Sequence, residues 1–209
     1  MLYPDARLLI FAKAPEAGTV KTRLIPVLGA QGAADLQRSL ILHQLQQATA
    51  LPLCPVELWV APDTSHAFFR HCSEQFGAAL RRQEGRDLGE RMAHAIDHGL
   101  RSAKFVLLIG TDCPTLSAER LDEALAALEA GSDAVFIPAE DGGYVAVGMR
   151  QSEPEVFTDI PWGGPDVMAR TRERLKSCRL NWLELEPLWD VDRPEDLARL
   201  EHIALDVPS

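Results

Sequence analysis

Cysteine is scarce in this chain, and no apolar run in it is long. The four cysteines form no CxxC pair, which argues against a disulfide framework and against a zinc site; they are Cys54, Cys72, Cys113 and Cys178. No apolar run approaches the ~18 residues that span a membrane, and no basic segment followed by an apolar stretch marks a signal peptide. We therefore expect a protein of the reducing cytoplasm.

Basic residues are also in the minority. Lysine and arginine number 21 against 31 aspartates and glutamates, which gives a formal net charge of −10. Nucleic acid and anionic membranes both bind basic surfaces, so we expect neither as a partner. The 209 residues, 46% of them hydrophobic, are enough to bury a sizeable core, and we expect one domain over 1–209.

Short apolar segments alternate with amphipathic ones along the chain. The apolar segments predict strands at Leu8–Ala12, Val56–Ala61, Ala79–Gln83, Phe105–Gly110, Ala134–Pro138, Tyr144–Met149 and Leu180–Leu185. Helical spacing predicts helices over 32–48, 88–100, 118–130, 165–177 and 194–204, with Ser117 capping the third. This alternation is typical of an α/β sandwich on a mostly parallel sheet. The link before Tyr144–Met149 is too short for a parallel crossover, which leaves an antiparallel strand or a local irregularity there.

The segment after the first strand is a cationic exception in an acidic chain. Lys13, Lys21 and Arg23 surround Gly18 there. A strand that runs into such a loop suits phosphate, because the backbone can approach closely at glycine and the cations offset the phosphate charge. The alternative is a solvated surface loop with incidental lysines.

Carboxylates follow the later segments, at the sheet edge where α/β proteins bind ligands. Asp112 follows the most apolar strand of the second half and suits Mg²⁺ or Mn²⁺, which prefer oxygen ligands; the alternative is an Asx-turn. Asp192 offers a second metal carboxylate, and Asp190 a less favoured one. Asp192 also begins a capping-box pattern with Pro194 and Glu195, a role compatible with metal binding.

Two glycine-containing loops complete the set of candidate site segments. The first is Asp141-Gly-Gly-Tyr144, which reads equally as a tight hairpin turn or as a site where Asp141 deprotonates an acceptor hydroxyl. The second, Pro161-Trp-Gly-Gly-Pro165, carries Trp162, which would stack on a ligand ring or plug the core.

These motifs occur together in a fixed order, running Phe11-Ala-Lys-Ala-Pro-x-x-Gly-x-Val-Lys-Thr-Arg-Leu24, Asp87-Leu-Gly-Glu-Arg-Met92, Gly110-Thr-Asp-Cys-Pro114, Pro138-Ala-x-Asp-Gly-Gly-Tyr144 and Asp190-Val-Asp-x-Pro-Glu-Asp-Leu197. Over about residues 7–200 they closely resemble a bacterial family of glycosyltransferases, often labelled arsenosugar-biosynthesis or radical-SAM/selenodomain-associated transferases. That family is similar to the nucleotide-diphospho-sugar transferase (GT-A) superfamily, which includes molybdenum-cofactor and phospholactate guanylyltransferases.

The resemblance implies a Rossmann-like three-layer sandwich with a mostly parallel mixed sheet whose first half binds nucleotide. It implies nucleotide or phosphate contacts from Ala12, Lys13, Gly18, Lys21, Arg23, Gln83, Gly89 and Asp112. It also implies Asp112 and Asp192 as metal ligands, with Gly142, Gly143, Tyr144 and Trp162 on the acceptor side. Two departures stand out, since this chain has Trp162-Gly163-Gly164 where the family usually has Trp-Ser-Thr, and Tyr144-Val-Ala where it tends to Tyr-Tyr-Leu.

Three functions follow as hypotheses. The first is glycosylation of a small-molecule acceptor from a nucleotide-diphospho-sugar, with Mg²⁺ or Mn²⁺ on Asp112, diphosphate on Lys21 and Arg23, and Asp141 as base. The second is a guanylyl- or cytidylyltransferase acting on a phosphorylated acceptor with a nucleoside triphosphate, where Asp112 and Asp192 hold paired ions. The third is a non-catalytic nucleotide-binding protein on the same scaffold, which the missing hydroxyls favour.

Overall fold

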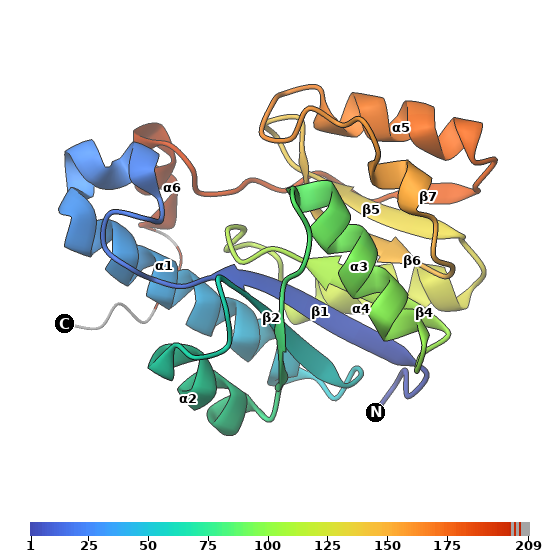
Figure 1. Ribbon diagram of the computed structural model, residues 1–209, viewed down its shortest axis with the longest axis horizontal. Coiled ribbons are helices and arrows are strands. Elements are labelled where there is room, and N and C mark those ends of the chain that lie inside the picture. The colour runs from blue at the N-terminus through green and yellow to red at the C-terminus, as the bar shows by residue number, and fades with distance from the viewer. Residues whose placement is uncertain (202, 204, 206–209) are drawn as a thin grey trace.

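The computed structural model describes residues 1–201, 203 and 205, and it contains a seven-stranded sheet with helices on both faces (Figure 1). The strands are β1 (Ala6–Lys13), β2 (Val56–Ala61), β3 (Ala79–Arg82), β4 (Phe105–Ile109), β5 (Ala134–Pro138), β6 (Tyr144–Met149) and β7 (Trp182–Glu184). Their order across the sheet is β3-β2-β1-β4-β6-β5-β7. All neighbours pair in parallel except β6, which is antiparallel to both β4 and β5. The predicted α/β class with a mostly parallel mixed sheet is confirmed.

Six α-helices and three 3₁₀ turns connect these strands in the described part of the chain. The helices are α1 (Ile25–Ala50), α2 (Ala67–Phe76), α3 (Leu88–Leu100), α4 (Ala118–Glu129), α5 (Val167–Ser177) and α6 (Leu197–Leu200). The 3₁₀ turns are η1 (Thr22–Leu24), η2 (Pro154–Phe157) and η3 (Pro194–Asp196). Within the described residues, no helix is both long enough and apolar enough to cross a membrane.

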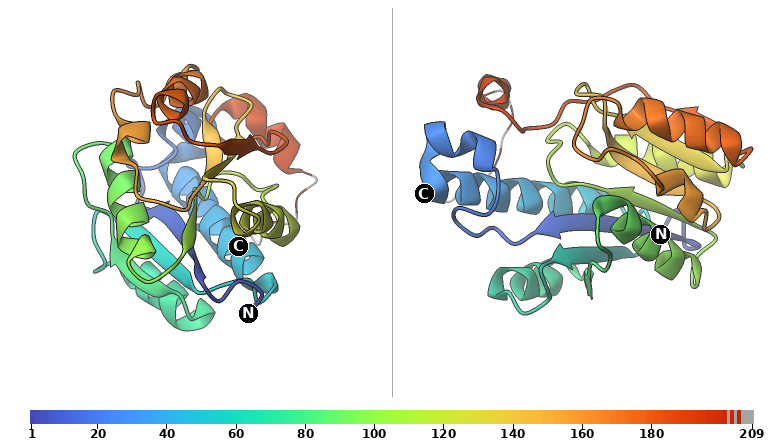
Figure 2. Two further views of the ribbon diagram at one scale, coloured as in Figure 1. Left: turned by 90° about the vertical axis from the view of Figure 1, so that its right-hand side faces the viewer. Right: turned by 45° about the horizontal axis from the view of Figure 1, so that its top comes forward.

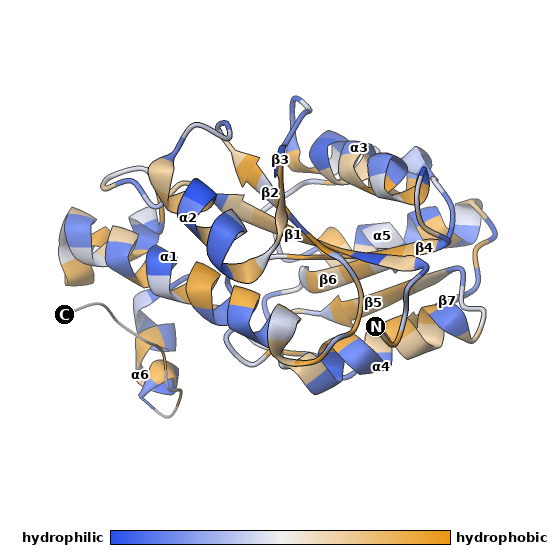
Figure 3. Cartoon of the chain, turned by 90° about the horizontal axis from the view of Figure 1, so that it is seen from below, coloured by the Kyte–Doolittle hydropathy of each residue, from blue (hydrophilic) through white to orange (hydrophobic). Residues whose placement is uncertain are grey.

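Two apolar layers hold the sandwich together. One packs α1, α2 and α4 on a face of the sheet through residues such as Leu45, Phe69 and Leu125. The other packs α3 and α5 on the opposite face through residues such as Met92 and Leu175. Figures 2 and 3 show the strands enclosed between these layers, and α3 and α5 lie on the other side of the sheet from α1 and α4. Alternate residues of a strand face opposite sides, so each central strand contributes to both layers.

Several predicted boundaries differ from the observed ones. Helix α1 begins before the predicted 32–48, and Gly29, with φ 72° and ψ 167°, interrupts it, so the prediction matched only its second part. The strand predicted over 79–83 ends at Arg82, that over 105–110 ends at Ile109, and that over 180–185 is confined to Trp182–Glu184. Helix α2 was not predicted at all. The predicted helix 194–204 is a 3₁₀ turn followed by the four residues of α6, and residues 202 and 204 lie outside the described residues.

A third cluster fastens the C-terminal segment to the start of α1. Leu24, Leu36 and Leu40 pack there against Trp189 and Val191. The segment that leads from β7 to α6 therefore runs beside the loop that follows β1, and the two are far apart in sequence.

Candidate functional site

A cleft of about 660 Å³ opens at the sheet edge where β1 and β4 end. The segments that follow β1, β3, β4, β5 and β7 contribute to its lining, as expected for an α/β sheet, and the loop at 162–164 after β6 joins them. The predicted site residues that line it are Ala12, Lys13, Lys21, Arg23, Gln83, Asp112, Asp141, Gly143, Tyr144, Trp162 and Asp192. Gly18, Gly89 and Gly142 are not among its lining residues, and each has a different structural role.

Lys13, the last residue of β1, fixes the shape of the loop that follows it. Lys13 Nζ donates to Thr19 O at 2.7 Å, and Thr19 Oγ1 donates to Glu16 O at 3.0 Å. Gly18 lies at the exposed turn with φ 83°, a backbone conformation that other residues adopt only under strain. Its role is to let the chain turn, and Lys13 shapes the loop from the rim of the cleft.

Lys21 is the buried cation of the cleft, with only 4% of its side chain exposed. Its Nζ lies 2.8 Å from Asp112 Oδ1 and donates to Val191 O at 2.5 Å. The backbone of Lys21 is left-handed, with φ 47°. A non-glycine residue in this conformation is uncommon and costs conformational energy, which the surrounding contacts must offset. Lys21 thus joins the loop, the end of β4 and the C-terminal segment at one point.

Arg23 and Asp192 form an ion pair at the exposed rim of the cleft. The predicted capping box starting at Asp192 is wrong. Asp196 is the capping side chain instead, because its Oδ2 accepts from the backbone amides of Arg193 at 2.7 Å and Asp192 at 3.0 Å. The carboxylate of Asp192 is therefore free of the helix and engages the cationic loop.

Two carboxylates of the cleft, Asp112 and Asp141, act electrostatically on a third, Asp190. Burial, and then repulsion from Asp141 and Asp112, raise the pKa of Asp190 to about 6. Asp112 Oδ1 is buried and receives no aligned hydrogen bond within the described structure, although Lys21 Nζ is close to it. Mutual repulsion and an under-satisfied oxygen are what a cation would relieve, so these donors fit Mg²⁺ or Mn²⁺. The described residues contain no ready-made group of three metal ligands.

The hairpin between β5 and β6 carries Asp141. Asp141 Oδ1 accepts from Gly143 N at 2.9 Å, which leaves Oδ2 for other partners. Gly142, with φ 94°, packs so closely on Pro165 that an added Cβ would lie 1.9 Å from the Pro165 carbonyl oxygen. Met168 N also donates to Gly142 O at 2.8 Å. The turn and the functional interpretations of this motif are therefore compatible, since a locked hairpin holds Asp141 at the cleft.

Trp162 and Tyr144 form an aromatic wall beside the hairpin. Their ring centroids are 6.4 Å apart at an interplanar angle of 87°. Burial raises the pKa of Tyr144, so its hydroxyl stays protonated. Trp162 rests on α3 at Gly89, where an added Cβ would lie 2.9 Å from the indole and 2.6 Å from Phe157 O. Gly89 thus leaves the space that the Trp162 indole occupies against α3.

Gln83 follows β3 and reaches across two neighbouring strand ends. Its Nε2 donates to Trp59 O at 2.9 Å and to Ala12 O at 3.2 Å. The side chain is half-buried and lines the cleft beside Leu88 and Met92, two apolar residues of α3. These two lining residues were not singled out from the sequence, because their helical spacing indicated only a core face.

Two further residues of the cleft were not recognised from the sequence. Gln37 and Thr111 are both buried, and Gln37 Nε2 donates to Thr111 Oγ1 at 3.4 Å. Thr111 could have been found from the sequence because it directly precedes Asp112. Gln37 could have been found because it is a polar amide on the otherwise apolar face of α1.

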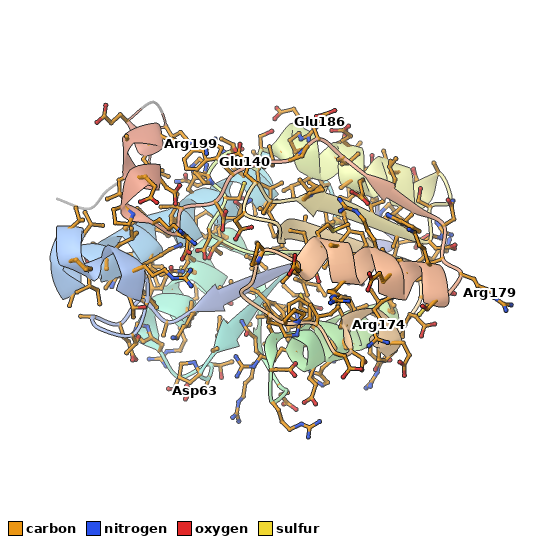
Figure 4. The ribbon with its side chains drawn as sticks, turned by 90° about the horizontal axis from the view of Figure 1, so that it is seen from above. Asp63, Glu140, Arg174, Arg179, Glu186 and Arg199 are labelled. Atoms are coloured by element: carbon orange, nitrogen blue, oxygen red, sulfur yellow. The ribbon has the colours of Figure 1, made fainter. Side chains whose placement is uncertain are left out.

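An arginine of α6, Arg199, joins two segments that lead into the cleft. Arg199 donates to both carboxylate oxygens of Glu140, at 2.7 and 3.1 Å, and its guanidinium stacks 4.3 Å from the Trp189 ring centroid. Figure 4 shows the labelled Arg199 and Glu140 side by side. Glu140 and Trp189 each precede a cleft carboxylate, Asp141 and Asp190, so Arg199 joins the two segments that carry them.

This chain is similar to a curated nucleotidyltransferase in sequence and to a solved transferase-like protein in structure. A curated phosphoenolpyruvate guanylyltransferase from Sphaerobacter thermophilus is 27% identical over 184 residues, which cover 87% of this chain and 86% of the relative. A solved protein from Desulfovibrio desulfuricans G20, provisionally assigned as a nucleotide-diphospho-sugar transferase, is 33% identical with a TM-score of 0.85, covering 96% of this chain and 89% of that one.

A more distant structure shares the fold. CMP:2-keto-3-deoxy-manno-octonic acid synthetase complexed with CTP matches with a TM-score of 0.60 at 11% identity, over 94% of this chain and 96% of the other.

A family model described as "Uncharacterized protein conserved in bacteria (DUF2064)" matches residues 44–164. The chain therefore belongs to the DUF2064 family, and its α/β fold is that of the nucleotide-diphospho-sugar transferases.

Proposed function

We propose that this protein is a metal-dependent transferase that uses a nucleotide-diphospho-sugar to glycosylate a small-molecule acceptor. The observation that carries the proposal is the buried ammonium of Lys21, which the cationic loop after β1 places beside the cleft carboxylate of Asp112. A buried cation in an open cleft of an acidic protein suits an anionic ligand. The likeness to the Desulfovibrio structure, the sequence motifs of the arsenosugar-type transferases and the fold agree with this proposal.

Each residue would have a definite role. Lys21 and Arg23 would bind the diphosphate through charge-assisted hydrogen bonds, with Lys13 keeping their loop in shape. Asp112 and Asp190 would hold Mg²⁺ or Mn²⁺, which neutralises the charge of the leaving diphosphate when bound. We favour Asp190 over Asp192 as the second ligand, because the charge of Asp112 acts on Asp190, whereas Asp192 is paired with Arg23.

The acceptor would lie against Trp162 and Tyr144. Asp141 would take the proton from its hydroxyl as the new bond forms between the acceptor oxygen and the anomeric carbon. The bond from that carbon to the diphosphate oxygen breaks, and the nucleoside diphosphate leaves. The Oδ2 atom of Asp141 is free for this purpose, since Oδ1 is bonded to the hairpin amide.

A nucleotidyltransferase is the second candidate, and the Sphaerobacter relative favours it. There an acceptor phosphate oxygen would attack the α-phosphorus of a nucleoside triphosphate, and pyrophosphate would leave. The same cationic loop would bind the triphosphate. The two reactions differ in their products, which makes them separable.

The test is a product assay across both donor classes. The protein is incubated with Mg²⁺ or Mn²⁺ and sugar nucleotides or triphosphates of the four bases, with a mixture of sugars and phosphorylated small molecules as acceptors. Release of nucleoside diphosphate from a sugar nucleotide supports glycosyl transfer. Acceptor-dependent release of pyrophosphate would replace that reading with nucleotidyl transfer, and failure to turn over or bind any nucleotide would overturn both.

A further inference from the structure

A polar face of α1 contacts the loop between β4 and α4, which is the loop that carries Asp112. His43 Nε2 donates to Pro114 O at 2.9 Å, and Gln44 Nε2 donates to Leu116 O at 3.2 Å. The first of these bonds requires the imidazole hydrogen on Nε2, because a carbonyl oxygen only accepts. Two backbone carbonyls of the loop therefore receive their hydrogen bonds from side chains of α1.

Two further contacts extend this face in both directions along α1. Gln37 Nε2 donates to Thr111 Oγ1 at 3.4 Å, and Gln47 Oε1 accepts from Ala118 N at 3.3 Å. Residues 37, 44 and 47 are spaced by seven and then three positions, so they share one face of the helix. The partners follow one another in the same order along the helix and along the loop, so α1 holds the loop at its start, its middle and its end.

The packing of the core does not by itself account for these polar residues. Gln44 is fully buried and Gln37 is 5% exposed, and a buried amide costs free energy unless it is hydrogen-bonded. Gln44 Oε1 has no hydrogen-bond partner within the described residues. An apolar side chain would fill the same space without that cost. What these amides contribute is therefore their bonds to the loop.

The bonds from α1 reach residues on both sides of Asp112. The loop itself forms neither helix nor strand, so its shape depends on such contacts. Asp112 is held directly by other segments, since Val191 N donates to Asp112 O at 2.8 Å and Lys21 Nζ lies 2.8 Å from Asp112 Oδ1. α1 adds the bonds to Thr111, which precedes Asp112, and to Pro114, which follows it. A ligand of a metal ion must be held to within about 0.5 Å, and these supports provide that precision.

We propose that His43 is a positioning residue, which acts through Pro114 O to hold Asp112 where the cleft binds a divalent cation. The inference rests on the proposed function, because it assumes a Mg²⁺ or Mn²⁺ site at Asp112. His43 is not among the lining residues of the cleft, so it acts on a ligand only through the loop. Removal of a group that orients a metal ligand typically weakens metal binding about 10- to 100-fold.

The test is the affinity for Mn²⁺, which needs no turnover. Mn²⁺ is titrated into the protein alone and with GDP or UDP, and the EPR signal of free Mn²⁺ gives the dissociation constant after correction for Mn²⁺ bound to free nucleotide. His43→Met removes the donor and should weaken binding about tenfold. His43→Gln keeps an N–H donor of similar reach and should stay within about twofold of the wild type. Gln46→Met is the matched control, because Gln46 is exposed on the same helix, and it should bind Mn²⁺ as the wild type does.

Urea unfolding of the same variants, without divalent cations, separates positioning from a purely structural role. A His43→Met protein that is less stable but binds Mn²⁺ as tightly as the wild type would overturn the inference. Equal losses of Mn²⁺ affinity in His43→Met and His43→Gln would also overturn it, because the N–H donor would then not be what matters.

Gln37→Met tests the same support on the other side of Asp112 and does not depend on the folding of a His43 variant. The bond from Gln37 is longer than that from His43, so the loss of Mn²⁺ affinity should be smaller, about threefold. Wild-type affinity in this variant would argue against α1 as the support of Asp112.

The failure of this inference and that of the proposed function give different results. If the wild-type protein binds no Mn²⁺, alone or with either nucleotide, the metal-dependent function fails and this inference fails with it. If the wild type binds Mn²⁺ and the His43→Met protein binds it equally well, only the inference fails.

Discussion

The two halves of the cleft are built on different principles. On the β1 side, parallel strands end in a loop that carries all three cations lining the cleft within the described residues, namely Lys13, Lys21 and Arg23. On the β5 side, an antiparallel hairpin presents Asp141 beside the aromatic wall of Trp162 and Tyr144. One half is therefore cationic, and the other carries a carboxylate beside two aromatic rings. Under the proposed function, the first half binds phosphate and the second receives the acceptor hydroxyl, so mutations in the two halves should affect binding and chemistry separately.

The largest expected effect is on chemistry and comes from the hairpin half. Asp141→Asn keeps the size of the side chain and its hydrogen bond to Gly143 N, but removes the base. Turnover should fall by about 10²–10⁴-fold, while the dissociation constant of the donor nucleotide stays within about twofold. Steady-state kinetics and calorimetry on one preparation would measure both. Weakened nucleotide binding with intact turnover would reverse the assignment of the two halves.

The next largest effect is on binding and comes from the loop half. Lys21→Met removes the buried ammonium but keeps a side chain of similar length, so nucleotide affinity should fall about 10- to 100-fold, as for one or two charge-assisted hydrogen bonds. Lys13→Met is the control, because Lys13 is exposed and bonded to the loop backbone, and it should lose only a few-fold. Equal losses for the two variants would show that overall loop charge matters more than the buried position.

The sequence alone predicted the features that depend on residues close together in the chain. The strands were predicted from their short apolar runs, and the site segments were predicted because each follows a strand. Helix α2 was missed because its start carries no serine or aspartate cap; His66 caps it instead, and its Nδ1 accepts from Phe68 N. The roles of Asp190 and Asp192 depend on contacts with Asp112 and Arg23, which no local pattern encodes.

The third effect concerns stability at the junction of the halves. The pKa of Asp190 is raised to about 6 in the folded state, so the folded protein binds more protons than the unfolded chain between about pH 4 and 6. Stability therefore falls as pH rises through this window. Asp190→Asn should raise the free energy of unfolding at pH 7.5 by about 1–3 kcal/mol and by nothing below about pH 4.

Urea unfolding at several pH values, without divalent cations, would measure this effect. Asp166→Asn is a suitable control, since Asp166 is exposed and makes no side-chain capping bond at the start of α5. A gain in stability that does not depend on pH would contradict the electrostatic origin. Loss of stability at pH 7.5 would show that the charged carboxylate is stabilising.

The smallest effect concerns the contact of α6 with the segments that follow β5 and β7. Arg199→Ala removes an exposed ion pair with Glu140 and the stacking on Trp189, which together should cost about 1 kcal/mol. Thermal melting would show a decrease of roughly 2–4 °C. Arg170→Ala, which breaks an exposed pair with Glu173 on α5, should change the melting temperature by less. Equal decreases would mean that the Arg199 contact is an ordinary surface pair.

The bond between Lys21 and Val191 has a consequence for how the protein is made. Its partners lie 170 positions apart, and Arg23 and Asp192 lie 169 apart. A ribosome therefore releases the loop after β1 early and its partner segment near the end of synthesis. The central strands can pair before that moment, but the charged half of the cleft cannot be completed. A chain cut short before Val191 would thus have most of its sheet but lack the two contacts that join the loop after β1 to the C-terminal segment.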